Sequence, residues 1–335
     1  MGLRVGADKS DIEGRRNARI YLIGLGTSLL GNSAMSLVAG IWVKSLTGSS
    51  SAAAVVSVCV YAPSLLGLVA GMVADRVRRR PMLMVLNLAS GVAVLPLLLL
   101  GGGVVAALDA ATFVIAAIAL TRLRITEPLP TKETRHWRAE LVAGFTHIRQ
   151  LPEMRAVVIA GAVAMGVSGV AVPAVYGLID GLHRAPSFLG VLTSLLGAGS
   201  IIASLTSGPM IRRIGERRLA VLGLLDGVIG YVLRATATIP TALASSFVLG
   251  FALPWTVVAV INLTQRGTPS ALQGRVSAAV MLALFAPVPV AQAVGAVVID
   301  RAGYRLVYLA AAAVTLATAT WLVIRPRPAS GARSG

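Results

Sequence analysis

The sequence predicts an all-α polytopic membrane protein of about ten transmembrane helices, arranged as two pseudo-repeated bundles of four and six helices. Hydrophobic residues make up 56% of the 335 residues and charged residues only 13%, about half the charged fraction of an ordinary soluble domain. The hydrophobic residues occur in blocks, and a helix needs about 20 such residues to cross a bilayer. Most Lys and Arg residues lie in the short segments between these blocks, as in loops that flank membrane helices.

Ten hydrophobic blocks are predicted to cross the membrane, with boundaries placed to within about two to four residues. They are 18–44, 52–74, 82–100, 104–121, 154–180, 187–211, 219–237, 241–264, 276–299 and 304–324. The run from 82 to 121 contains 40 residues and a single charge, Asp109. One helix of that length would measure about 60 Å, twice the hydrocarbon thickness of about 30 Å. We therefore expect two helices that turn at Gly101-Gly102-Gly103.

These blocks divide the chain into five regions. They are a cytoplasmic N-terminal tail (1–17), a shortened four-helix N-terminal bundle (18–124), a cytoplasmic linker (125–153), a six-helix C-terminal bundle (154–324) and a disordered tail (325–335). In the linker, Trp137, Leu141, Phe145 and Ile148 recur at helical spacing, which predicts an amphipathic helix lying on the cytoplasmic leaflet. A helix that binds a soluble partner protein is the alternative.

The distribution of positive charge predicts the orientation of the chain. With the N-terminus inside, 25 of the 30 Lys and Arg residues fall in cytoplasmic segments and four in outer segments. The remaining one, Arg234, lies within a predicted span, and we expect its charged end to extend outward. The bias predicts a multi-pass protein of the cell membrane with both termini in the cytoplasm. The net charge of +17 then reflects this topology and an attraction to anionic membrane lipids. It does not indicate nucleic-acid binding, because the charge is spread over short loops instead of one face.

Catalytic and cofactor chemistry finds little support in the sequence. One cysteine, Cys59, and three histidines disfavour a metal cluster and exclude an intrachain disulfide, so no metal or cofactor is expected. The sequence contains no ATP-binding Walker loop, no Gly-x-Ser-x-Gly elbow and no kinase motif. An enzyme acting on lipids would need paired catalytic groups near one membrane interface, and none are found. We therefore expect a protein that is not an enzyme and does not bind ATP itself.

A short charged stretch occurs twice, each time after the second span of its half. Residues 71–80 read GMVADRVRRR, and residues 208–217 read GPMIRRIGER. Aligning the leading glycines places Arg80 opposite Arg217. Two halves of the same orientation form the parallel repeat of one large class of secondary transporters.

The first copy resembles the loop signature of the major facilitator superfamily, Gly-x-x-x-Asp-Arg-x-Gly-Arg-Arg. The matching residues are Gly71, Asp75, Arg76, Arg79 and Arg80, and Arg78 stands where the family has glycine. The stretches LGTSLLGNSAMSLVAGIWVKSLTGSS and LTQRGTPSALQGRVSA are similar to the family's drug, macrolide or siderophore exporter branch. The similarity covers nearly the whole chain. The family has twelve helices, so the resemblance implies that the equivalents of the fourth and fifth are missing here.

The resemblance also implies a gating role for the 71–80 loop. It would latch the two halves together when the cavity is open outward, with Asp75 facing the helix that starts at Gly274-Arg275. The physical basis is that a carboxylate is stabilised at the positive end of a helix dipole. The alternative is that the arginines between 76 and 80 only anchor the loop on the cytoplasmic side.

Three polar residues inside predicted spans are candidate substrate or proton sites: Asn32, Asp109 and Asp226. An Asp in mid-bilayer costs about 2.5–3.5 kcal/mol on insertion scales and usually faces protein or water. Either carboxyl group could carry a proton for antiport, whereas the neutral Asn32 could bind substrate but not a proton. The alternative is that both carboxyl groups form buried, hydrogen-bonded contacts between helices.

The sequence therefore predicts a secondary active transporter that exports small hydrophobic molecules, of the drug, antibiotic or siderophore type, by proton antiport. The alternative is a transport-inactive relative that serves as a membrane partner or scaffold subunit. With two helices missing, the N-terminal half would leave a groove bordered by Asn32, and lipid cannot satisfy polar groups that face such a groove. Lipid headgroups, water or a second protomer would fill the groove. The protein is therefore expected either to self-associate through the N-terminal half or to lack coupled transport.

Overall fold

The computed structural model describes residues 38–49, 103–121 and 137–325, together with the helical positions Val85, Leu88, Ala89 and Val92. The chain forms two compact units, Met1–Gly40 with Leu66–Thr134 and Ile41–Leu65 with Arg135–Gly335. Every regular element in the described residues is a helix. The predicted all-α class is therefore confirmed.

The described part of the first unit is mainly one helix, α6 (Gly103–Thr121), which is 19 residues long. It begins at the last residue of the triple glycine and covers the predicted span 104–121. The backbone of Asp109 belongs to this helix.

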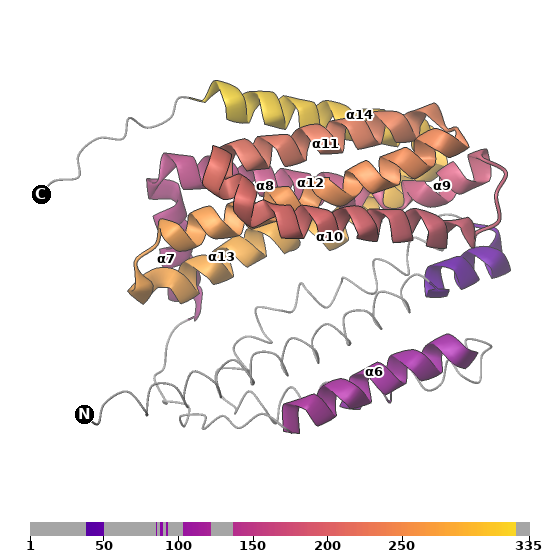
Figure 1. Ribbon diagram of the computed structural model, residues 1–335, viewed down its shortest axis with the longest axis horizontal. Coiled ribbons are helices and arrows are strands. Elements are labelled where there is room, and N and C mark those ends of the chain that lie inside the picture. Colours follow the sequence, from indigo (N-terminus) through magenta and orange to yellow (C-terminus); the bar gives the residue numbers. More distant parts are fainter. Residues whose placement is uncertain are drawn as a thin grey trace, which may run out of the picture. The chain divides into compact units, whose positions relative to one another are not determined.

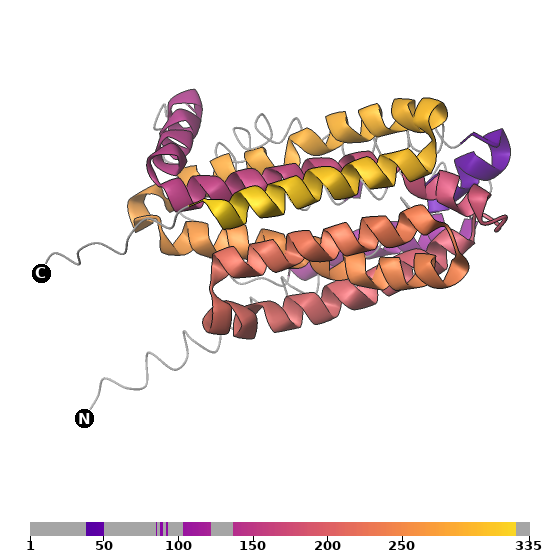
Figure 2. The same cartoon turned by 90° about the horizontal axis from the view of Figure 1, so that it is seen from above.

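The second unit contains the long helices of the C-terminal half. They are α7 (Trp137–Gln150), α8 (Pro152–Ala171), α9 (Ala174–Gly181), α10 (Phe188–Ile214), α11 (Glu216–Thr236), α12 (Ile239–Arg266), α13 (Gln273–Phe285) and α14 (Pro287–Ile324), with a short 3₁₀ turn, η2 (Ser270–Leu272), before α13. Residues 41–47 are also helical and belong to this unit. Figures 1 and 2 show α8 and α10 to α14 running side by side along a common direction.

Five stretches in the described residues are long and apolar enough to cross a membrane. They are Pro152–Ala171, Phe188–Ile214, Glu216–Thr236, Ile239–Arg266 and Ser270–Ile324. The last stretch, 55 residues long, contains two helical arms, because α14 breaks at Gly303 with φ 73° and ψ 157°. Glycine adopts positive φ at little steric cost. The break falls between the predicted spans 276–299 and 304–324, so each arm is a separate membrane-length segment.

Local chemistry explains the tight connections between α10, α11 and α12. Gly215 joins α10 to α11 with φ 83°, again a conformation that favours glycine. Between α11 and α12, the Thr238 side chain accepts a hydrogen bond from the Thr241 backbone, and the Thr241 side chain accepts one from the Thr238 backbone. This reciprocal arrangement satisfies helix-end donors that would otherwise be unpaired.

Helix α7 corrects the expectation for the linker. Its Ile148 is only 4% exposed and joins the hydrophobic core, against which Phe145 also packs. A Cβ added to Gly144 would collide with the backbone of Arg275 at the start of α13. Val142, an apolar residue of the same helix, is 62% exposed. The interpretation that this stripe lies on the lipid leaflet is therefore wrong for Phe145 and Ile148. Figure 2 shows α7 at one end of the bundle, crossing it steeply.

Candidate functional site

A cavity of about 120 Å³ lies inside the C-terminal bundle, among α8, α10, α11, α12 and α14. Its polar lining residues are Ser168, Ser200, Tyr231, Arg234, Thr256 and Thr315. Pockets for drug-sized ligands measure about 300–1,000 Å³, so this cavity is too small for one. It has room for a few water molecules or one small solute.

Three of the hydroxyl groups along this cavity donate their protons to their own helices. Ser200 Oγ donates to the Leu196 carbonyl at 2.9 Å, and Thr256 and Thr315 Oγ1 donate to carbonyls one turn earlier at 2.7 Å each. Each hydroxyl therefore presents oxygen lone pairs, not a free proton, to the cavity.

Glycines let the surrounding helices approach closely and so set the shape of the cavity. A Cβ on Gly199 of α10 would meet the backbone carbonyl of Phe247 on α12. A Cβ on Gly223 of α11 would lie 2.5 Å from Thr256 Oγ1, and one on Gly230 would meet the Leu249 side chain. Small residues allow such backbone contact between membrane helices, where packing drives association.

Arg234 is the one charged residue in the lining, and it does not extend outward as expected. It is 7% exposed, and its Nη2 donates to Ser246 Oγ of α12 at 3.2 Å. The guanidinium carbon lies 5.7 Å from the centre of the Tyr308 ring, which in turn stacks against Tyr231 at 6.3 Å. The Nε of Arg234 and the hydroxyl of Tyr308 are buried, and within the described structure neither has a partner at hydrogen-bonding geometry. The expectation failed because α12 and α14 cover this end of α11.

Asp226 lies in the middle of α11 and is half-buried. It follows Leu225, which is exposed, and precedes Gly227, which is buried. No hydrogen bond or ion pair reaches its carboxylate from the described part of the chain. Asp226 and Arg234, both on α11, form no ion pair with each other.

The second copy of the charged motif ties helix ends together, a role that the sequence interpretation missed. Glu216 is buried and accepts a hydrogen bond from Arg266 Nη1 at the end of α12, at 2.6 Å. The neighbouring Arg217 donates from Nε to the Leu322 carbonyl at 3.2 Å, and its Nη2 donates to the carbonyls of Leu322 and Arg325. The internal repeat drew attention to this segment, but it did not predict that Glu216 and Arg217 would contact the ends of α12 and α14.

The start of α13 contains Gly274 and Arg275. The N-terminus of α13 has no side-chain cap and no acidic residue in its first turn, and nothing in the described structure lies within 4 Å of a Cβ placed on Gly274. Arg275 Nε lies 3.7 Å from Glu140 Oε1 of α7. The structure therefore brings the linker helix to the helix start that the latch hypothesis assigns to Asp75.

An ion pair connects the end of the first predicted span with α9. Lys44 Nζ lies 2.5 Å from Asp180 Oδ2, and the two side chains are 7% and 51% exposed. Lys44 also donates to the Gly48 carbonyl at 3.1 Å. The sequence pattern did not predict this ion pair, because the two residues lie 136 positions apart.

The remaining predicted site residues fall outside this description. Asn32, Gly71, Asp75, Arg76, Arg79 and Arg80 lie outside the described residues, and for Asp109 only the helical backbone is described. The described residues hold no group of three or more His, Cys, Asp or Glu that could bind a metal ion.

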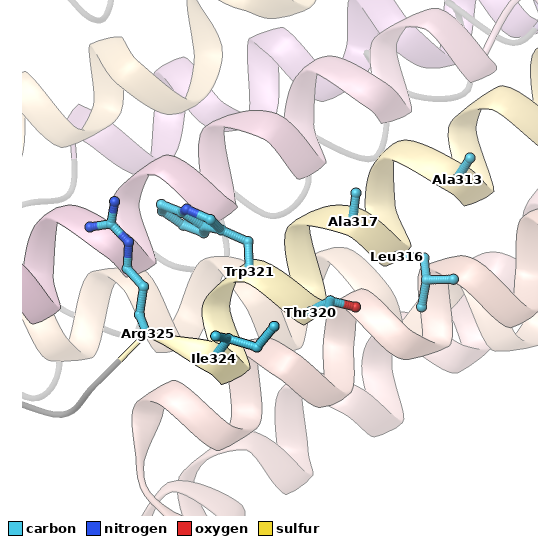
Figure 3. Close-up of a pocket in the computed structure, with 7 residues that line it drawn as sticks. All are labelled: Ala313, Leu316, Ala317, Thr320, Trp321, Ile324 and Arg325. Atoms are coloured by element: carbon cyan, nitrogen blue, oxygen red, sulfur yellow. The ribbon is translucent and has the colours of Figure 1, made fainter.

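A larger depression of about 780 Å³ runs along α14 alone (Figure 3). Its lining residues are Ala313, Leu316, Ala317, Thr320, Trp321, Ile324 and Arg325. They come from one side of one helix, and the Arg325 guanidinium lies 4.4 Å from the centre of the Trp321 ring. An apolar face that ends in Trp and Arg is typical of a lipid-facing surface near the membrane interface. We therefore do not assign a binding role to this depression.

Comparisons with known proteins agree with this architecture. The model of the family described as Major Facilitator Superfamily matches residues 157–335. No curated protein matches the sequence. Among solved structures, the crystal structure of a point mutant of the nucleoside transporter NupG is similar, with a TM-score of 0.54 and 14% sequence identity. The similarity covers 92% of this chain and 89% of that chain, and at this identity it shows the fold alone.

Proposed function

Because the chain belongs to the Major Facilitator Superfamily, we propose that it is a secondary active transporter that exports small hydrophobic molecules in exchange for protons. Family membership and the five membrane-length stretches make it a multi-pass membrane protein of a transporter family. The export direction and the drug, antibiotic or siderophore class rest on the similarity of the 71–80 loop and its neighbouring stretches to the exporter branch. The charge bias supports a cell-membrane location with both termini inside.

The proposal of proton coupling rests on the position of Asp226. This carboxylate sits midway along an apolar helix of 21 residues, with no partner in the described part of the chain. An ionisable group at such a depth is costly unless protein, water or a transported ion serves it. A carboxyl group that alternately binds and releases a proton meets that requirement. Asp109, in α6, is the second proton candidate, and Asn32 remains the proposed substrate contact in the first span.

The gating part of the proposal concerns the uncapped start of α13. A carboxylate docked there would satisfy backbone N–H groups and meet the positive end of the helix dipole. Asp75 is the proposed occupant, held in place by Gly71 and the arginines at 76, 79 and 80. Glu140 beside Arg275 supports the idea that acidic groups gather at this helix start.

Uptake into proteoliposomes with an imposed proton gradient tests the proposal. The substrates would be a fluorescent lipophilic dye, a hydroxamate siderophore and a nucleoside, the last because a fold relative carries nucleosides. We expect uptake of the dye or siderophore that a protonophore abolishes. Asp226→Asn should remove the gradient dependence, and Asp300→Asn, which alters an exposed carboxyl of α14, should not.

Two other results would redirect the assignment. Gradient-driven uptake of the nucleoside alone would replace the substrate class and keep the mechanism. No uptake of any substrate, from protein that is folded in the vesicles, would favour the scaffold alternative.

A further inference from the structure

We propose that the C-terminal bundle binds a small monovalent anion, a halide or a small carboxylate, against Arg234 in the 120 Å³ cavity. The site lies within one bundle, among α8, α10, α11, α12 and α14. It does not depend on the transport function proposed above.

The first argument is the charge on Arg234. Its side chain is 93% buried, being 7% exposed, and a buried charge is costly unless it is paired. No acidic side chain in the described residues forms an ion pair with it. The nearest acid along the same helix, Asp226, is eight residues away, about 12 Å along the axis. The C-terminal end of α11, where Arg234 lies, supplies about half a negative charge. The site therefore has a net positive charge that an anion would neutralise.

The second argument is the supply of hydrogen-bond donors. A guanidinium carries five N–H donors, and in the described part of the chain the Arg234 side chain donates one hydrogen bond to another side chain, to Ser246 Oγ. That hydroxyl donates its own proton to the Ala242 carbonyl, so it is already satisfied. In the described part of the chain, the Arg234 Nε is buried without a hydrogen-bond partner, and so is the hydroxyl of Tyr308, whose ring lies against the guanidinium. Arg234 lines the cavity and Tyr308 does not. The guanidinium of Arg234 therefore supplies the donors there, and a ligand that only accepts hydrogen bonds fits it.

The third argument is size. The cavity excludes drug-sized molecules but has room for a halide or formate with a few waters. The hydroxyls of Ser200, Thr256 and Thr315 present oxygen lone pairs. They can therefore accept hydrogen bonds from the waters around the anion, while Arg234 binds the anion itself.

The test measures thermal unfolding of the purified full chain in detergent at constant ionic strength. Chloride, bromide and formate are compared with gluconate, whose polyhydroxy chain is too large for the cavity. A ligand that binds only the folded state raises its stability by mass action, so we expect a midpoint higher by about 2–4 °C. A response to chloride and bromide alone identifies a halide site, and one to formate alone a carboxylate site.

Three variants test whether the stabilisation by anions comes from the site at Arg234. Arg234→Met should remove the anion dependence, and replacing a buried charge by an apolar residue of similar volume is often tolerated. If Arg234→Met does not fold, Tyr308→Phe provides a second variant. It removes the hydroxyl beside Arg234 and should weaken the stabilisation by anions. Arg213→Met, at an exposed arginine of α10, is the matched control and should respond like the wild type. A wild-type midpoint that is the same in all salts would overturn the proposal, and so would an equal response in all variants.

Discussion

Arg217 stabilises the carbonyl end of α14. The last carbonyls of a helix have no partner within the helix, and the Arg217 guanidinium supplies donors to those of Leu322 and Arg325. The side chain is 9% exposed, so water cannot easily replace it. Its neighbour Glu216 holds Arg266 at the end of α12. Two consecutive residues of the repeated motif thus secure two helix ends.

Replacing Arg217 should therefore destabilise the bundle. We expect Arg217→Met to lower the free energy of unfolding by about 1.5–3 kcal/mol, the usual cost of losing hydrogen bonds to a charged group. Arg218→Met is the matched control, because Arg218 is exposed, and a surface change of this kind stays within about 0.5 kcal/mol. Unfolding of both variants in detergent would be compared. Equal effects would mean that the contacts with α14 contribute nothing.

The long helices pack through their glycines. Gly199 of α10 and Gly250 of α12 approach each other's backbone so closely that a Cβ on either would meet a main-chain carbonyl. A backbone carbonyl cannot move aside as a side chain can. By contrast, a Cβ on Gly197, also in α10, would meet nothing within 4 Å among the described residues. Of these two glycines in α10, only Gly199 is therefore required for the close contact with α12.

The two glycines of α10 give a paired prediction. Gly199→Ala should cost about 1–3 kcal/mol of stability, because it overpacks a tight contact. Gly197→Ala should be neutral or stabilising by up to about 1 kcal/mol, since alanine is the better helix former. Unfolding midpoints of the two variants measure the difference. A tolerated Gly199→Ala would show that α10 and α12 can separate without penalty.

Lys44 and Asp180 connect distant parts of the whole chain, being 136 residues apart. They join the end of the first predicted span to α9, within the unit that combines Ile41–Leu65 with Arg135–Gly335. One partner is buried and the other half exposed. The pair should therefore contribute more than an exposed salt bridge but less than a buried one.

A double-mutant cycle measures this connection. Lys44→Met and Asp180→Asn should each lower stability, and the double variant should lose less than the sum. We expect a coupling energy of about 1 kcal/mol, within the range for residues in contact. Lys44→Met combined with Asp300→Asn is the control and should be additive. Additivity in the first cycle as well would rule out a stabilising role for the ion pair.

Much of the fold is readable from the sequence alone. The spans 187–211 and 241–264 correspond to α10 and α12, and the boundary before 304 corresponds to the break at Gly303. The tight connections at Gly215 and Thr238 follow from local turn and cap chemistry. The contacts of the candidate site could not be predicted in the same way. Arg234, Arg217 and Lys44 each bind a group on another helix, and the sequence pattern does not show which helices lie next to each other.

The sequence by itself determined that the described part of this protein is built mainly from membrane-length helical stretches. Lipid offers no hydrogen bonds to the backbone, so an apolar block of sufficient length must be helical, and that requirement acts locally along the chain. Only the tertiary structure decided that Arg234 turns inward, that Ile148 packs against the bundle and that Arg217 reaches α14. Those outcomes depend on how each helix is rotated and how closely glycines let its neighbours approach. Both are properties of residues far apart in the sequence, so no local pattern records them.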